Sequence, residues 1–176
     1  MPRDNTASGY ATNVFINCPF DVEFEPLFHA LVFAVIQCGY TVNNLPRFNM
    51  PFELGLFLGA RRFGTKPQRG KQCLVLGAER YRYQKYLSDI AGQDIRQHDN
   101  EPAKAVGAVR DWLAASRAKS AKPLPGATAI MRHYREFQAN LPAMLRAADL
   151  EPAELGFFDR ANLMAQFLAR RAALAV

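Results

Sequence analysis

Apolar and polar positions alternate with different periods along the chain, and the first unit they predict is a strand followed by a helix. Val14 and Ile16 share one face of a short strand, which Pro19 ends because proline cannot donate to a central ladder. An apolar helix follows from Glu25 to Cys38, and Gly39 supplies its C-terminal cap. Strand, loop and apolar helix in this order indicate an open α/β sheet.

The pattern continues with further strands and helices as far as residue 113. Short strands are predicted at 40–42, 72–77 and 94–98, with a helix over 79–87, a turn at 88–92 and a helix from Pro102 onward. Ligands of such sheets bind outside the carboxyl ends of the strands. The loop at 17–21, which follows the first strand, is therefore a candidate site.

The last fifty residues carry helical patterns alone. Ile130, Tyr134, Phe137 and Leu141 mark one apolar face at helical spacing, and the following Pro142 is predicted to end that helix. A last helix is predicted to begin at an Asp159 cap. We expect a flexible tail at 1–11, an α/β domain at 12–117, and a helical extension at 126–176 that packs on the sheet or contacts another copy.

The helix predicted from Phe52 to Ala60 is apolar around nearly its whole circumference, with Asn49 as its N-cap. We therefore expect it to be buried, with Gly55 and Gly59 allowing another backbone to approach closely. Glu53 is the single ionisable side chain in this run. Such a carboxylate must be paired, hydrogen-bonded, shifted in pKa or directed into a cleft, and we favour the cleft over a structural role.

Composition and charge are those of an ordinary globular protein with a basic surface. The chain has 176 residues, of which 49% are hydrophobic and 22% charged, and its net charge is +6. The basic residues are spread along the sequence, so we interpret most of them as a solvated surface and do not expect nucleic-acid binding. No apolar run is long enough to span a bilayer, and the polar N-terminus is no signal peptide. We expect a soluble cytoplasmic protein without a membrane partner.

Cysteine and histidine give no sign of a metal centre. Three cysteines without a close pair argue against a disulfide framework or a four-cysteine zinc site, and the three histidines form no ligand motif. We expect no metal and no resident cofactor.

Three phrases of the sequence resemble a known family. They are Phe15-Ile-Asn-Cys-Pro-Phe-Asp21, Arg47-Phe-Asn-Met-Pro-Phe-Glu-Leu-Gly55 with its continuation to Gly59, and Tyr81-Arg-Tyr-Gln-Lys-Tyr-Leu-Ser-Asp-Ile-Ala-Gly92. They are similar to a bacterial subfamily, usually labelled only as nucleotide-binding, of the Toll/interleukin-receptor (TIR)-like and nucleoside 2-deoxyribosyltransferase-like group. The resemblance covers about residues 12 to 113. It implies a flavodoxin-like open parallel sheet, of strand order 2-1-3-4-5, with helices on both faces.

The resemblance also implies a chemistry. Members of the group cleave or exchange N-glycosidic bonds in NAD or nucleosides, and the position of their key glutamate matches Glu53. A carboxylate there stabilises an oxocarbenium-like sugar, attacks it as a nucleophile, or holds the ribose hydroxyls. The helix N-terminus favours an ionised Glu53 and the apolar surroundings oppose it. NAD would be a substrate rather than a cofactor.

Two loops supply the remaining site candidates. We expect substrate contacts from Asn17, Cys18, Pro19, Phe20, Asp21, Arg47, Phe48, Asn49 and Phe52. Asn17 either holds the substrate or ties its own loop, and Asp21 is more typical of a helix cap than of a base. Cys18 lacks a placed histidine partner, so a buried thiol is favoured over a nucleophile.

One departure from the family pattern concerns the centre of the sheet. A helix and the third strand are expected between Val42 and Leu45, where only Asn43 and Asn44 stand. About 40 residues are missing if a helix, a strand and their loops are needed. Either the chain has lost them and the sheet is rebuilt, or the printed sequence joins the ends of an absent segment. We favour the second, because a central strand is hard to delete.

Two functions from different classes follow. The first is an N-glycosidase acting on NAD or a related nucleotide or nucleoside, in bacterial antiphage defence. The alternative is a non-catalytic module that senses a nucleotide or assembles with other copies. Nucleic-acid binding ranks last.

Overall fold

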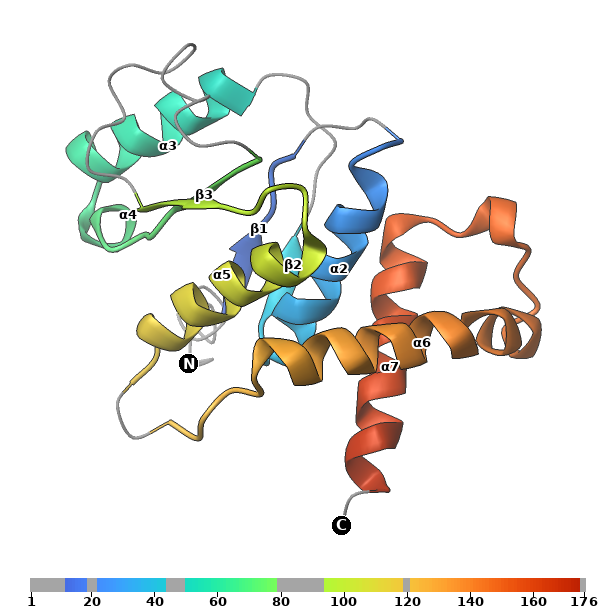
Figure 1. Cartoon of the computed structure of the whole chain (residues 1–176). Coiled ribbons are helices and arrows are strands. Elements are labelled where there is room, and N and C mark those ends of the chain that lie inside the picture. The colour runs from blue at the N-terminus through green and yellow to red at the C-terminus, as the bar shows by residue number, and fades with distance from the viewer. Residues whose placement is uncertain (1–11, 19–21, 44–49, 79–93, 119–120, 175–176) are drawn as a thin grey trace, which may run out of the picture.

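The computed structural model describes residues 12–18, 22–43, 50–78, 94–118 and 121–174, and every structural statement below concerns these residues. The tail at 1–11, the predicted helix at 79–87 and the turn at 88–92 lie outside them. The elements, shown in Figure 1, are β1 (Asn13–Phe15), α2 (Glu25–Gln37), β2 (Thr41–Asn43), α3 (Met50–Phe63), α4 (Lys66–Arg69), β3 (Leu74–Gly77), β4 (Asp94–Gln97), α5 (Pro102–Ala115), α6 (Ala127–Ala147), η2 (Pro152–Glu154) and α7 (Phe157–Ala173).

The strands form two separate parallel pairs. β1 pairs with β2, with Val14 opposite Val42, and β3 pairs with β4, with Val75 opposite Ile95. The chain is thus of the mixed α/β class, and the four described strands lie where the sequence predicts them. The single open sheet implied by the resemblance is not formed by these strands. Residues 44–49, between β2 and α3, are too few for a helix and a further parallel strand.

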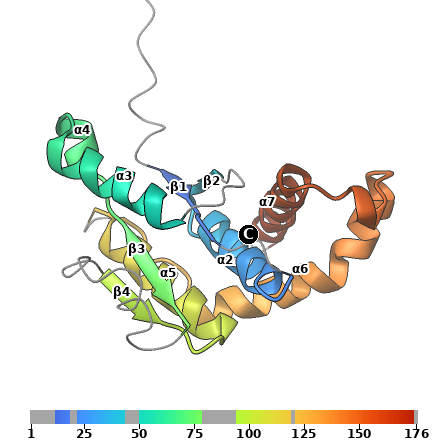
Figure 2. The ribbon, with the colours of Figure 1, turned by 90° about the horizontal axis from the view of Figure 1, so that it is seen from above.

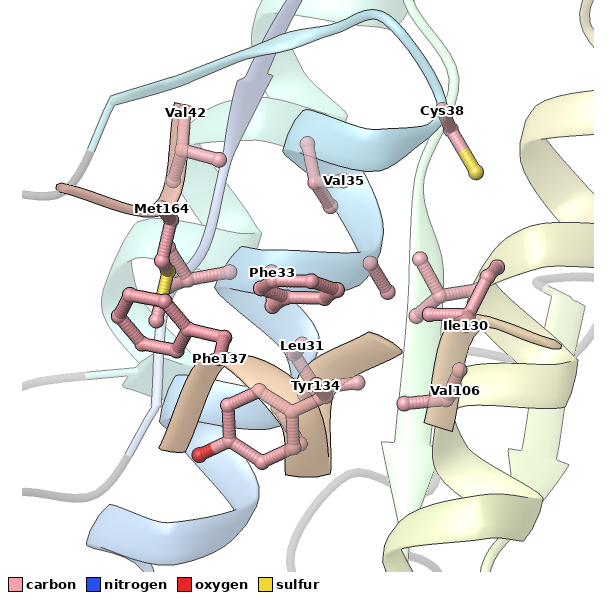
Figure 3. Packing of buried hydrophobic residues seen from close by; sticks show 14 of the residues in the cluster. Leu31, Phe33, Val35, Cys38, Val42, Val106, Ile130, Tyr134, Phe137 and Met164 are labelled. Carbon is pink, nitrogen blue, oxygen red and sulfur yellow. The ribbon is translucent and has the colours of Figure 1, made fainter. Parts of the chain in front are cut away.

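The core is built around α2. This helix packs against α5, α6 and α7, and its residues Ala30 to Val35 are all buried. Phe33 is fully buried, with its ring centroid 5.3 Å from that of Tyr134 and 5.8 Å from that of Phe137. In Figure 3, Phe33 lies between Met164 and Phe137 on one side and side chains of α5 and α6 on the other. A helix that is apolar all round is stable here because neighbours cover several of its sides.

The two C-terminal helices join this core, and two of their predicted boundaries are wrong. α6 continues through Pro142 to Ala147, because an exposed proline removes one hydrogen bond to the preceding turn without displacing the packed side chains around it. α7 begins after Gly156, so Asp159 lies in its first turn rather than at its cap. Both helices pack on α2 rather than on the strands.

Helix α3 forms as predicted, but the expectation that it is buried is wrong. Phe52, Leu56 and Phe63 are 60%, 59% and 83% exposed. A Cβ atom added at Gly55 or Gly59 would meet nothing within 4 Å, so no close backbone lies against either glycine in the described chain. The reason is that, among the described elements, α3 packs chiefly on the four-residue helix α4. Figure 2 shows these two helices on the opposite side of the molecule from α6 and α7.

Candidate functional site

Glu53 lies in the first turn of α3, where the unpaired N–H groups of the helix favour negative charge. Its side chain is partly buried, and its Oε2 atom is out of contact with water and has no hydrogen-bond partner in the described part of the chain. A polar atom in this condition costs free energy until a donor reaches it. Glu53 therefore provides a hydrogen-bond acceptor suited to a hydroxyl or amide donor.

Phe52 precedes Glu53 but lies on a different side of the helix. Successive residues of an α-helix are turned by about 100°, and Phe52 is 60% exposed while one oxygen of Glu53 is shielded. The structure therefore gives Phe52 an outward position, shared with Leu56, rather than a place beside the shielded carboxylate oxygen.

The segment after β1 contains the other two predicted site residues that the structure describes, Asn17 and Cys18. Asn17 is partly buried and Cys18 is 4% exposed. The burial of Cys18 agrees with the thiol as a small core residue rather than an accessible nucleophile. Asn17 is not joined to the shielded oxygen of Glu53 by a hydrogen bond.

Six of the predicted site residues cannot be compared with the fold, because they lie outside the described residues. They are Pro19, Phe20, Asp21, Arg47, Phe48 and Asn49. What the structure brings to this part of the site is thus one partly buried carboxylate on α3 and one partly buried amide after β1. Each of these side chains has a polar group of the kind that binds hydroxyl groups.

The sequence interpretation missed His98, which lies at the carboxyl end of the other strand pair. Its backbone N–H donates to the carbonyl oxygen of Gly77 at 3.0 Å, and its side chain is 4% exposed with no partner for Nδ1 among the described residues. Burial lowers the pKa of His98, which favours the neutral ring. The following Asp99 has a left-handed backbone (φ 52°), so the chain turns sharply here. The signal available in the sequence was a histidine at the carboxyl end of the predicted strand 94–98.

A hollow of the structure lies away from the predicted site, and the described residues hold no metal cluster. One open hollow of about 550 Å³ lies between α6 and η2, and none of the predicted site residues lines it. Its walls include Leu141, Leu145 and Leu150. Within the described ranges, no three His, Cys, Asp or Glu side chains are grouped as a metal site would require. No described helix is long and apolar enough to cross a membrane.

A scan of protein-family models, a search of curated proteins and a search of solved structures each found no match to this chain. The function must therefore be argued from the residues themselves and from the sequence resemblance.

Proposed function

We propose that the chain binds NAD or a related nucleotide or nucleoside and acts as an N-glycosidase, with Glu53 as its catalytic carboxylate. The observation that carries this proposal is the shielded Oε2 atom of Glu53 in the first turn of α3, which lacks a donor among the described residues. The hydroxyl groups of a bound ribose are donors of the required kind. Asn17 is a second polar group for the same substrate.

The proposed chemistry follows from the position of the carboxylate. Breaking the bond between the sugar C1′ atom and the base nitrogen develops positive charge on the sugar. A carboxylate in a partly shielded site stabilises that charge more strongly than water does, since the local dielectric constant is lower. Glu53 therefore acts by stabilising the oxocarbenium-like sugar, by attacking it, or by fixing its hydroxyl groups, and water completes the hydrolysis.

The strand order of the sheet is part of the same proposal. In this proposal the two parallel pairs correspond to strands 2-1 and 4-5 of the flavodoxin-like order, and none of the described strands takes the place of strand three. The short connection from β2 to α3 supports this interpretation, because no parallel strand fits into it. The resemblance to TIR-like proteins is the support for a role in bacterial antiphage defence in the cytoplasm. The proposed activity requires neither nucleic acid nor a spanning segment.

The test is to incubate the purified chain with NAD, nucleosides and nucleotides and to separate the products by chromatography. We expect release of the free base, and loss of about a thousandfold in rate on Glu53→Gln, which keeps the shape but removes the charge. The matched control is Asp159→Asn, which removes an acid from the first turn of α7 and leaves the rate unchanged. Equal rates in the native chain and in Glu53→Gln contradict the role of Glu53.

A second candidate function, a non-catalytic nucleotide sensor or assembly module, has one observation in its favour. Of the predicted site residues that the structure describes, only Glu53 and Cys18 can ionise, and Cys18 is buried. A single partly buried carboxylate can bind a ribose without a second group to protonate the leaving base. Calorimetry that detects nucleotide binding, while chromatography detects no product, selects this alternative.

A further inference from the structure

Three large apolar side chains lie in a line on the outward face of α3. Phe52, Leu56 and Phe63 are spaced by four and seven residues, which places them on one side of a helix. The exposed fractions of these three side chains are 60%, 59% and 83%. Exposed apolar residues gathered on one face mark an interaction surface more often than scattered ones do.

A group of cations lies at the C-terminal end of α3 and in and after α4, close to Phe63 in the sequence. Five basic residues and no acidic residue occur between 54 and 78, and all five side chains are exposed: Arg61, Arg62, Lys66, Arg69 and Lys71. The sequence interpretation treated them as part of a dispersed solvated surface, but α3 and α4 pack together and gather them at one corner (Figure 1).

Hydrogen bonds fix the position of α4 relative to the end of α3. The Nε atom of Arg69 donates to the carbonyl oxygen of Gly64 at 2.9 Å, and Thr65 and Gln68 form a capping box at the start of α4. These contacts hold α4 against the end of α3. We name the line of Phe52, Leu56 and Phe63 together with the five cations the α3–α4 surface.

We propose that the α3–α4 surface binds the surface of an anionic lipid bilayer. A helix with apolar side chains along one face and cations beside it lies in the headgroup region, where the apolar groups leave water and the cations meet phosphate. Five cations without an acid complement a negative membrane surface. The lack of a spanning helix among the described residues does not bear on this mode of binding, which needs none.

The apolar line favours lipid over nucleic acid. Binding to a phosphodiester chain uses cations, and stacking of bases uses aromatic rings that flank a groove. Leu56 offers no stacking surface, and it lies on the exposed side of α3 between the two phenylalanines. A bilayer, in contrast, accepts all three side chains at once. The inner side of α3, which carries the shielded oxygen of Glu53, stays directed toward the protein.

The experiment is sedimentation of the full chain with vesicles of phosphatidylcholine mixed with phosphatidylglycerol, and with vesicles of phosphatidylcholine alone. We expect binding to the anionic vesicles that weakens with added salt, and little binding to the neutral ones. The double variant Arg62→Gln, Lys66→Gln is expected to bind roughly 20-fold more weakly, since each cation near the membrane contributes about fivefold. Phe63→Ser is expected to lose about tenfold.

Matched controls distinguish binding by the α3–α4 surface from binding caused by net charge or by any exposed apolar side chain. Arg135→Gln with Arg146→Gln removes two exposed cations from α6, and Phe158→Ser removes an exposed phenylalanine from α7. Both controls are expected to bind like the native chain. Equal losses in the control and test variants overturn the proposal, because net charge alone then explains binding.

Two other binding partners of the α3–α4 surface, nucleic acid and a second copy of the chain, would give different experimental results. Absence of binding to the anionic vesicles, with duplex DNA bound by the native chain and no longer bound by the variant Arg62→Gln, Lys66→Gln, overturns the proposal in favour of nucleic acid. Absence of vesicle binding with a dimer that Phe63→Ser dissociates, seen by light scattering, overturns it in favour of a second copy. None of these outcomes depends on catalysis, so failure here is distinct from failure of the Glu53 proposal.

Discussion

Helices α2 and α3 have similar apolar sequences and opposite surroundings. Phe33 at the centre of α2 is fully buried among rings of α6 and α7, whereas Phe63 at the end of α3 is 83% exposed. Both helices form, so the local sequence is sufficient for the helix in each case. The difference shows that burial is decided by which elements lie next to a helix. α2 has three helical neighbours, and α3 has chiefly one short one.

The largest expected effect comes from removing the central ring of α2. Phe33→Ala is expected to lower the free energy of unfolding by about 3–5 kcal/mol, because it removes a buried side chain and leaves a cavity. Phe63→Ala, the matched change on α3, is expected to alter it by less than about 0.5 kcal/mol. Urea unfolding of both variants measures the contrast. Equal losses would show that α3 is as well packed as α2.

The next effect is a loss of stability in acid from a histidine on α2. Burial and the nearby Arg160 lower the pKa of His29 to about 4, against the partial opposing effect of Glu25 at 3.8 Å. The unfolded chain binds a proton below about pH 6.5, while the folded chain stays neutral down to about pH 4. The contribution of neutral His29 to the free energy of unfolding is therefore fully present above about pH 6.5. It falls by up to about 3 kcal/mol as the pH decreases from about 6.5 to about 4.

Unfolding measured at pH 7 and pH 4.5, in the native chain and in His29→Gln, isolates this contribution. The decrease on acidification is expected to be smaller in the variant. Burial lowers the pKa values of His98 and His133 as well, so some decrease is expected to persist. An identical decrease in both chains would contradict the assignment to His29.

A smaller effect, of opposite sign, is expected in α3. Gly55→Ala should raise the free energy of unfolding by about 0.5–1 kcal/mol, since alanine favours the helix and the added Cβ meets nothing within 4 Å. Thermal unfolding is a sufficient measurement. The matched change Gly39→Ala is expected to destabilise, because Gly39 has a left-handed backbone with φ 82°. Destabilisation by Gly55→Ala would mean that another surface contacts this side of α3.

The sequence predicted the positions of helices and strands better than it predicted which elements pack against one another. Gly39 ended α2 as its position indicated, and the predicted strands at 72–77 and 94–98 form as Leu74–Gly77 and Asp94–Gln97. Pro142 misled the interpretation because the tertiary contacts of α6 outweigh one missing hydrogen bond. Burial of α3 could not be inferred from its own residues, since a local apolar pattern does not contain the identity of the partner surface.

The candidate site was foreseen only in part. The isolation of Glu53 in an apolar run indicated an unusual carboxylate, and its Oε2 atom is indeed shielded without a donor in the described residues. Phe52 was expected beside it, but the helical turn between consecutive residues directs Phe52 outward. His98 was passed over because no second histidine or cysteine stood near it in the sequence, whereas its burial depends on the packing after β4.

The most direct test of the contrast between the two helices is hydrogen exchange of their backbone amides, followed by NMR or mass spectrometry. Amides in the buried part of α2, from Leu31 to Val35, are expected to exchange only through global unfolding. Amides of α3 beyond its first turn are expected to exchange at least about a hundredfold faster, through local opening. Equal protection in α2 and α3 would contradict the claim that, among the described elements, α3 has chiefly the short helix α4 as its neighbour.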